Sequence, residues 1–589
     1  MHTRMYLPGA LVVLSAAIPG ISQIQNQADD GQWQMAAKNY ASTRFSTLSD
    51  INTNNVKNLK LDWSFSTGLT RGHEAAPLVV NGTMYVVTPW PNLLYALDLT
   101  KPGGPAKWTY APHPSASAQG VACCDVVNRG GAYYKGRIYY NTLDVHTVAV
   151  DANTGKEVWK TSLGDINLGE SITMAPLVVK GKVLVGNSGG EFGVRGWLAA
   201  LDAETGKLLW RAYSTGPDKD VLIGSNFKPF YEQDRGKDLG IRTWQGEQWK
   251  IGGGASWSWI SYDPDLDLIY YGTSNPGPWN PEMRPGDNKW TSALFARRPD
   301  TGEAIWAYQL NPHDDHDYDG VNENILLDLT INGQMRKVLA HPDRNARMYL
   351  MDRATGEVLS AVPFANQNTS ESVDLKTGKI KYAPSKTTGF KTVRDICPAA
   401  PGGKDWQPSS YSPRTGQIYI PHNNLCMEEQ GVQANYIAGT PFVGANVRMY
   451  AGPGGHRGEL TAWDPVAAKT TWKVKEMFPV WSGTVVTAGD VVFYGTMDGW
   501  FKAVDARSGA PLWQFKVGSG IIGQPVTYKG PDGKQYVAVL SGVGGWSGAI
   551  VAGGLNSKDG TGALGFVNAM TDLPQYTTTG GMLYVFSLP

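Results

Sequence analysis

A short pattern of apolar and polar positions recurs along the chain. It consists of two apolar residues, an aspartate, a turn that contains glycine, and a tryptophan four residues after the glycine. Complete copies occupy residues 149–159, 200–210 and 503–513, and looser copies occupy residues 96–108, 300–306 and 462–472. A further copy, from Asp352 to Ser360, has lost its tryptophan, and Trp63 fits an opening copy without the turn. The chain is therefore a repeat protein.

Each copy predicts a strand, a tight turn formed by the aspartate and the glycine, and a second strand whose tryptophan packs between neighbouring sheets. There are eight copies, most of them about 40 to 54 residues apart, which matches one four-stranded blade per copy. We predict an all-β, eight-bladed β-propeller with tryptophan-docking repeats, in which a last strand over residues 582–586 completes the first blade. A helical solenoid is disfavoured because helical periodicity is nearly absent.

Two intervals between copies are roughly twice as long as the others, from residue 210 to 306 and from 360 to 472. Both predict long inserted loops. Such loops commonly carry the functional residues of a protein.

The N-terminus has the pattern of a signal peptide. Arg4 precedes an apolar run over residues 6–18, and small residues follow at Gly20 and Ser22. A membrane anchor is the alternative, but a span needs about 20 apolar residues and this run is shorter. We expect residues 1–22 to be removed and residues 23–589 to form a single propeller domain in an oxidising compartment, with no membrane span.

Composition narrows the classes of protein further. With 42% hydrophobic and 18% charged residues, the chain fits neither a disordered nor a membrane protein. The charges of the 52 basic and 52 acidic residues cancel, so the chain lacks the net positive charge that favours binding to nucleic acid. The 70 glycines, 21 tryptophans and 27 tyrosines suit many short strands joined by tight turns.

Four motifs lie between the predicted blades: residues 123–130 (CCDVVNRG), 272–280 (GTSNPGPWN), 317–323 (DYDGVNE) and 403–408 (GKDWQP). Together with the repeats, they resemble pyrroloquinoline quinone (PQQ)-dependent alcohol dehydrogenases over essentially the whole mature chain. Within that family the sequence looks most like the catalytic subunit of lanthanide-dependent methanol dehydrogenases. The resemblance implies a periplasmic enzyme.

The resemblance implies a metal site with the protein ligands Glu191, Asn275 and Asp317. All three offer oxygen, which suits calcium or a lanthanide and argues against zinc or copper. Asp319 is a fourth candidate, at a position where calcium enzymes of the family usually carry a small neutral residue. Its extra negative charge matches a trivalent ion, so we expect a lanthanide, with Ca²⁺ as the alternative. By itself, the stretch 313–320 could be a polar turn, and the resemblance gives its two histidines no role.

PQQ is a flat tricarboxylate quinone, so its site needs two apolar faces, polar donors and a Lewis acid. The resemblance places Trp257 under one face and a disulfide between Cys123 and Cys124 over the other. Adjacent Cα atoms lie only about 3.8 Å apart, which makes such a bridge strained and leaves two free thiols as the alternative. The remaining Cys397 and Cys426 are expected to pair. The implied polar contacts to PQQ are Glu74, Arg129, Thr173, Ser188, Gly189, Gly190, Arg344, Asp405, Trp481 and Trp546.

The implied reaction is the oxidation of methanol or another short primary alcohol to the aldehyde. Asp317 would accept the hydroxyl proton as general base while a hydride passes to metal-activated PQQ, and Arg344 would stabilise the developing negative charge. The chain has no Cys-x-x-Cys-His haem motif, so the electron acceptor is expected to be a separate c-type cytochrome. The family also implies a homodimer, and Trp279 is a candidate wall of the substrate pocket. The alternatives are a calcium enzyme for larger alcohols and a non-catalytic envelope scaffold.

Overall fold

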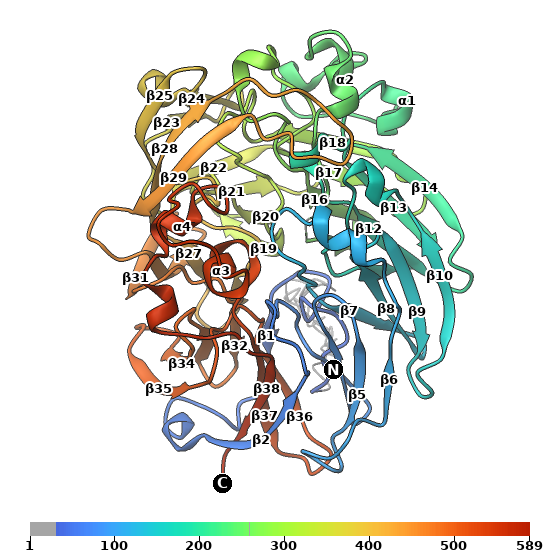
Figure 1. The fold of residues 1–589 in the computed structure, drawn as a ribbon, viewed down its shortest axis with the longest axis vertical. Coiled ribbons are helices and arrows are strands. Elements are labelled where there is room, and N and C mark those ends of the chain that lie inside the picture. Colours follow the sequence, from blue (N-terminus) through green and yellow to red (C-terminus); the bar gives the residue numbers. More distant parts are fainter. Residues whose placement is uncertain (1–30, 258) are drawn as a thin grey trace, which may run out of the picture.

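The computed structural model describes residues 31–257 and 259–589, and it is mostly β-structure. The predicted signal peptide, residues 1–22, lies outside the described residues. In Figure 1 the sheets follow one another around the molecule in the order of the sequence, so that the last sheets lie beside the first. This arrangement agrees with the closed repeat that the sequence predicts.

The repeats form seven four-stranded sheets and one five-stranded sheet within the described residues. The first four in chain order are β3–β6 (Leu78–Val80, Thr83–Val87, Leu94–Asp98, Trp108–Tyr110), β7–β10 (Gly131–Tyr134, Arg137–Thr142, His146–Asp151, Glu157–Ser162), β11–β14 (Leu177–Val179, Lys182–Gly186, Trp197–Asp202, Leu208–Tyr213) and β15–β18 (Ser261–Asp263, Leu268–Gly272, Ala293–Arg297, Ala304–Gln309).

The next two sheets are β19–β22 (Ile325–Ile331, Gln334–Pro342, Arg347–Asp352, Val358–Pro363) and β26-β27-β30-β31 (Ser410–Ser412, Gln417–Asn423, Gly458–Asp464, Lys469–Glu476). The five-stranded sheet is β1-β32-β33-β34-β35 (Phe45–Ser46, Val485–Thr487, Val491–Gly495, Trp500–Asp505, Pro511–Lys516). The last sheet is β2-β38-β37-β36 (Lys60–Ser66, Met582–Ser587, Gln535–Ser541, Val526–Lys529). Strand β38 pairs antiparallel with both β2 and β37, which confirms that the C-terminal strand completes the N-terminal sheet.

Five of the repeat tryptophans pack against the glycine turn of the following sheet. A Cβ atom added at Gly155 would lie 2.6 Å from the ring of Trp108 in the preceding sheet. The same relation holds for the pairs Gly206 and Trp159, Gly302 and Trp210, Gly356 and Trp306, and Gly509 and Trp472. For Trp159, Trp210, Trp306 and Trp472 the indole N–H also donates to a backbone carbonyl of the next sheet, as from Trp159 to Ala203 at 3.1 Å. The predicted packing of tryptophan between sheets is confirmed.

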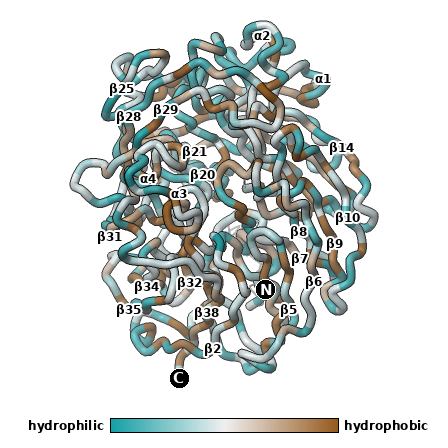
Figure 2. Tube along the Cα trace, viewed as in Figure 1, coloured by the Kyte–Doolittle hydropathy of each residue, from teal (hydrophilic) through white to brown (hydrophobic). Residues whose placement is uncertain are grey.

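Buried apolar residues concentrate in the first three strands of the repeat sheets. All residues of β3, β4, β11 and β16 are buried, whereas the residues of the outer strands β10 and β35 are exposed or half-buried. Hydrophilic residues gather in the loops at the periphery (Figure 2). The core therefore lies between neighbouring sheets rather than on their outer edges.

The two long intervals contain short elements as well as loops. The first holds α1 (Asp218–Val221) and α2 (Leu239–Arg242). The second was expected to be loop, but it forms the hairpin β23-β24 (Ser370–Asp374, Lys379–Tyr382) and a three-stranded sheet β25-β28-β29 (Thr392–Ile396, Leu425–Gly431, Ala445–Ala451). The predicted disulfide between Cys397 and Cys426 is present beside this sheet, with an S–S distance of 2.03 Å.

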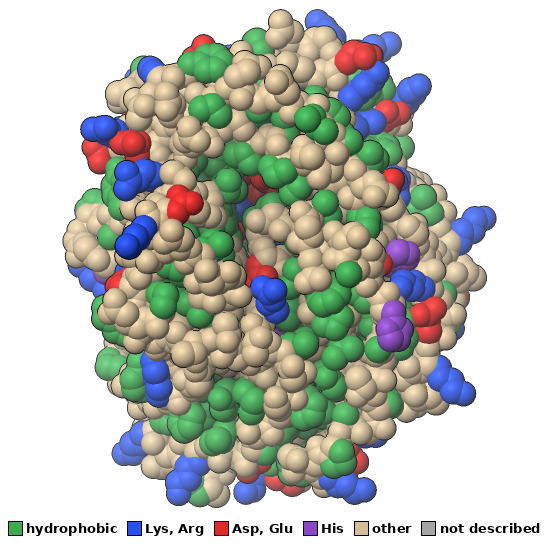
Figure 3. Space-filling model, viewed as in Figure 1, with side chains coloured by type: hydrophobic (Ala, Val, Ile, Leu, Met, Phe, Trp, Pro, Cys, Tyr) green, Lys and Arg blue, Asp and Glu red, His purple; other side chains and the backbone are tan. Residues whose placement is uncertain are grey.

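Two more helices, α3 (Gly545–Ala552) and α4 (Phe566–Ala569), precede β38. Short 3-10 helices occupy Val56–Asn58, Ala116–Val121, Ile166–Leu168, Gly190–Phe192, Glu232–Asp234, Gln248–Ile251, Pro281–Met283, Pro384–Lys386 and Leu573–Gln575. Within the described residues, no helix combines the length and the apolar character needed to cross a membrane. The face drawn in Figure 3 is hollowed near its centre, beside α3, and acidic side chains are visible within the hollow.

Candidate active site

A pocket gathers nearly all the residues that the sequence analysis assigned to the cofactor and the metal. Its predicted members are Glu74, Cys123, Cys124, Arg129, Thr173, Ser188, Gly189, Glu191, Trp257, Asp317, Asp319, Arg344, Asp405, Trp481 and Trp546. Gly190 and Asn275 lie in the wall behind them, since a Cβ atom at Gly190 would be 3.5 Å from Asn275 Oδ1. Residues far apart in the sequence are thus brought to one place by the closed arrangement of sheets.

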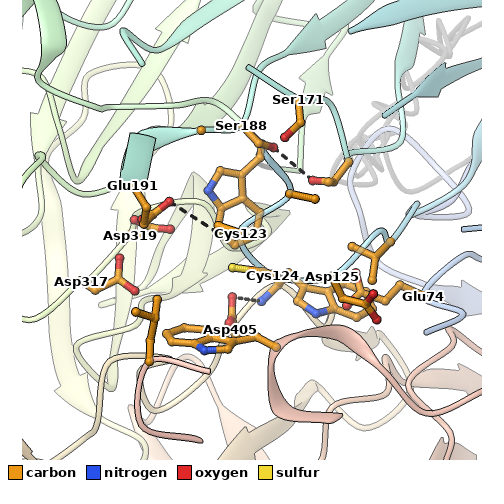
Figure 4. A pocket seen from close by; sticks show the side chains of 18 of the residues that line it. Glu74, Cys123, Cys124, Asp125, Ser171, Ser188, Glu191, Asp317, Asp319 and Asp405 are labelled. Carbon is orange, nitrogen blue, oxygen red and sulfur yellow. Dashed lines mark hydrogen bonds between the residues drawn. The ribbon is translucent and has the colours of Figure 1, made fainter. Parts of the chain in front are cut away.

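The pocket has two ends of different character. Figure 4 places Glu191, Asp317 and Asp319 on one side, Glu74 and Asp125 on the other, and the two cysteines between them. We call the first side the metal end and the second the far end.

The metal end is built on the loop that follows β18. Asp317 adopts a φ of 66°, a left-handed backbone conformation that is uncommon for a residue with a side chain. This turn lets Asp319 N donate to Asp317 O at 3.1 Å and presents both carboxylates to the same side. The backbone N–H of Asn275 donates to Asp319 Oδ1 at 2.5 Å, which ties the second loop to the first.

Two buried oxygen atoms at the metal end, Asn275 Oδ1 and Asp317 Oδ1, have no hydrogen-bond partner among the residues that the structure describes. Buried acceptors normally have a partner, so such orphaned oxygens fit a cation that bonds to oxygen. Burial, reinforced by the charges of Asp319 and Glu191, raises the pKa of Asp317 well above its ordinary value, although Arg344 opposes the shift. Burial likewise raises the pKa of Asp319. A bound cation would relieve this repulsion.

The candidate ligand residues at the metal end lie near one another but are not arranged as a complete set of metal ligands. Among the residues that the structure describes, no group of three or more His, Cys, Asp and Glu side chains is arranged as a metal cluster. The chemistry of the four candidate ligands, three carboxylates and one amide, still fits calcium or a lanthanide.

Arg344 connects the candidate base to the rest of the pocket. Its guanidinium lies 2.9 Å from Asp317 Oδ2, 2.8 Å from Asp405 Oδ1 and 3.4 Å from Asp319 Oδ2, and all four side chains are almost fully buried. One cation therefore faces three carboxylates, which leaves the metal end with excess negative charge even before Glu191 is counted.

The far end carries the polar donors expected for a carboxylated ligand. Arg129 Nε lies 3.0 Å from Glu74 Oε2, and its Nη1 donates to Thr173 Oγ1 at 2.7 Å. The Arg129 guanidinium is 4.8 Å from the Trp257 ring and 4.9 Å from the Trp406 ring, so two indoles hold it in place. Burial raises the pKa of Glu74 to about 8, against the opposing charge of Arg129.

The two neighbouring cysteines lie over the middle of the pocket. The bond that the resemblance implies between Cys123 and Cys124 is not formed in the structure, which shows both as free thiols. Cys123 Sγ instead donates to Glu191 Oε2 at 3.7 Å. The short Cα separation of adjacent residues is the physical reason why this bridge is strained and hard to form.

Two further tryptophans close the pocket as expected. Trp546 on α3 donates from its indole to Ala563 O at 2.7 Å, while the indole of Trp481 faces Glu74 and opposes the rise in the pKa of that carboxyl. Trp279, the candidate wall, also lines the pocket.

Some lining residues were missed by the sequence analysis: Asp125, Ser171, Trp406 and Leu564. Asp125 and Trp406 each follow a predicted residue directly, so position within a motif was a usable signal. Ser171 and Leu564 lie outside all four motifs and carried none.

Comparison with known proteins identifies the class. Residues 33–373 and 448–537 match the PQQ family described as "Glucose/ethanol/alcohol dehydrogenase, beta-propeller domain". The chain belongs to this family of PQQ-dependent dehydrogenases. The propeller, the indole-lined pocket and the oxygen-rich metal end are consistent with that membership.

Relatives within this family include several methanol dehydrogenases. The chain is 54% identical to the lanthanide-dependent methanol dehydrogenase of Methylacidiphilum fumariolicum, over 98% of this chain and 96% of the relative. It is 46% identical to subunit 1 of the methanol dehydrogenase (cytochrome c) of Methylorubrum extorquens, over 98% of this chain and 94% of the relative. Among solved structures, a europium-containing methanol dehydrogenase superposes with a TM-score of 0.94 at 55% identity, covering 95% of this chain and 98% of that one. A non-catalytic scaffold gains no support from these relatives.

Proposed function

We propose that this protein oxidises methanol and other short primary alcohols to aldehydes, with PQQ in the pocket and a lanthanide ion at the metal end. The observation that carries the proposal is the convergence of Glu191, Asn275, Asp317 and Asp319 at one end of a pocket that also contains Trp257. Three carboxylates match a trivalent cation better than a divalent one.

The bound groups would supply a quinone that accepts two electrons and a Lewis acid that polarises it. The chain itself would supply the proton transfer. Asp317 accepts the hydroxyl proton of the alcohol, and Arg344, 2.9 Å from Asp317 Oδ2, orients that carboxylate and, together with the bound cation, would favour its ionised form. Arg129 and Thr173 would bind cofactor carboxylates at the far end, and Trp257 would stack against the planar rings.

The same resemblance supports several properties of the whole protein. The eight repeat sheets are proposed to be the eight blades of one propeller domain that spans residues 23–589 after removal of a signal peptide. We propose a periplasmic homodimer, as the family resemblance implies, that passes electrons to a c-type cytochrome; the name of the Methylorubrum relative supports the cytochrome acceptor.

The test is to reconstitute apoprotein with PQQ plus lanthanum or with PQQ plus calcium, and to measure turnover over a short alcohol series. We expect turnover with lanthanum, highest for methanol and short alcohols. Turnover with calcium alone and with larger alcohols would instead establish the calcium-dependent alternative, and absence of any quinone-dependent turnover would refute both.

A further inference from the structure

The loop that carries the metal end is anchored to the inserted sheet β25-β28-β29 by a buried histidine. The His316 ring is 3% exposed and lies between two carboxylates: Nδ1 is 3.4 Å from Glu429 Oε2 on β28, and Nε2 is 3.2 Å from Asp315 Oδ1. The ring is therefore enclosed by two buried carboxylates, and we call His316, Asp315 and Glu429 the buried triad. Nothing in the proposed chemistry requires this triad.

A second anchor lies close to the first. The hydroxyl of Tyr318 donates to Pro398 O at 2.6 Å. Pro398 follows Cys397, whose disulfide partner Cys426 precedes Glu429 on β28. The disulfide between Cys397 and Cys426 therefore links the segment that contacts Tyr318 to the strand that carries Glu429.

The anchored residues flank Asp317 directly, with His316 before it and Tyr318 after it. Asp317 itself is held in a left-handed conformation, which persists only where the surroundings determine it strongly. The two flanking side chains reach the same inserted sheet region, so they fix the backbone on both sides of this residue.

Asp315 strengthens the same anchor from the opposite side. Its Oδ2 accepts from Thr388 N at 2.7 Å, and Arg284 donates to the carbonyl of Asp314. Glu429 is 1% exposed, and its second oxygen, Oε1, has no hydrogen-bond partner among the described residues, so His316 is its principal contact.

From this geometry we infer that Glu429 is a positioning residue for the metal end: paired with His316, it holds the Asp317–Asp319 loop where its carboxylates can share one cation with Asn275. The inference rests on the proposed function, because it assigns that cation to the same site. It assigns the inserted sheet β25-β28-β29 a role in positioning the metal ligands. Residues behind metal ligands commonly change metal affinity or activity by about 10–100-fold when replaced.

The test is Glu429→Gln, which keeps the volume of the side chain and removes its charge. Binding of Tb³⁺ to the apoprotein is followed by luminescence excited through tryptophan, so the readout does not depend on turnover. We expect at least about tenfold weaker Tb³⁺ binding, together with a fall in kcat of the reconstituted enzyme at little change in KM for methanol. Tyr318→Phe, which removes the second anchor, should weaken binding in the same direction.

A matched control is Glu459→Gln on β30. Glu459 is also a buried carboxylate held by histidines, 2.7 Å from His456 and 3.4 Å from His422, but it does not contact the loop. It should lower thermal stability without changing Tb³⁺ affinity. Wild-type Tb³⁺ affinity in both Glu429→Gln and Tyr318→Phe, or an equal loss in Glu459→Gln, would overturn the inference. Failure of the proposed function would show separately, as wild-type protein that binds Tb³⁺ but lacks PQQ-dependent turnover.

Discussion

At the scale of single residues, Asp319 decides the charge of the metal end. Its buried carboxylate lies 3.4 Å from the Arg344 guanidinium and accepts a hydrogen bond from the backbone N–H of Asn275. Replacing it with alanine removes one negative charge and leaves Glu191, Asn275 and Asp317 in place. We expect Asp319→Ala to lose lanthanum-supported turnover while still taking up calcium, measured by metal analysis and turnover side by side. Equal turnover with either metal would contradict the charge-matching argument.

Asp317, in the same loop, is proposed to be the general base of the reaction. Removing a general base typically costs about 10²–10⁴-fold in rate. We expect Asp317→Ala to lose at least that much turnover, because among the described residues Asp317 is the only carboxylate that accepts a hydrogen bond from Arg344 Nη1. The measurement is single-turnover reduction of bound PQQ by methanol. Turnover near the wild-type rate would show that Asp317 is not the base.

Glu74 makes the stability of the apoprotein depend on pH. Its pKa is about 8 in the folded protein against 4.5 in an unfolded chain, because burial disfavours the charged form. The folded state therefore binds the proton more tightly, and this contribution is complete below about pH 4.5 and lost as the pH rises through about 8. We expect the free energy of unfolding of wild-type apoprotein, relative to Glu74→Gln, to fall between pH 5 and pH 8 in urea titrations. A difference that stays constant with pH would contradict this.

Most of the pocket could be predicted from the sequence because its residues sit in dense motifs. Glu191, Asn275 and Asp317 were assigned by resemblance, and the structure brings them to one end of the pocket. Leu564 and the His316–Glu429 pair could not be found in this way. Their contacts depend on how separate loops meet, and no local pattern records that.

At the scale of elements, the glycine turns fit the tryptophans of neighbouring sheets. Gly155 and Gly136 both have a positive φ and lie in turns of the same sheet, but only Gly155 faces a tryptophan; nothing lies within 4 Å of a Cβ atom at Gly136. We expect Gly136→Ala to cost about 1–2 kcal/mol from backbone conformation alone, and Gly155→Ala to cost about 1–3 kcal/mol more from overpacking. Urea unfolding measures both, and equal costs would show that the tryptophan contact contributes nothing.

The repeat units were predictable as elements because aspartate, glycine and tryptophan recur at fixed offsets. The inserted strands were not. Strand β23, for example, has mostly exposed or half-buried residues, so it lacks the alternation of apolar and polar positions that identifies a strand in a sequence.

At the scale of the whole molecule, β38 holds the arrangement of sheets together. It pairs with β2 on one side and β37 on the other. We expect truncation after Gly581 to give protein that neither binds PQQ nor elutes as a compact species in gel filtration, because β2 and β37 both lose their partner. Truncation after Ser587, which leaves β38 intact, is the control. A compact, PQQ-binding product from the shorter chain would contradict the role assigned to the strand.

The pairing of β2 with β38 also determines when their sheet can form during synthesis. Strand β2 leaves the ribosome long before β38, so the sheet to which both belong is incomplete until β38 has been synthesised. The chain therefore cannot finish folding sheet by sheet as it emerges, as a row of independent domains could. An export machinery that accepts only unfolded chains would find this protein incompletely folded until β38 has been synthesised.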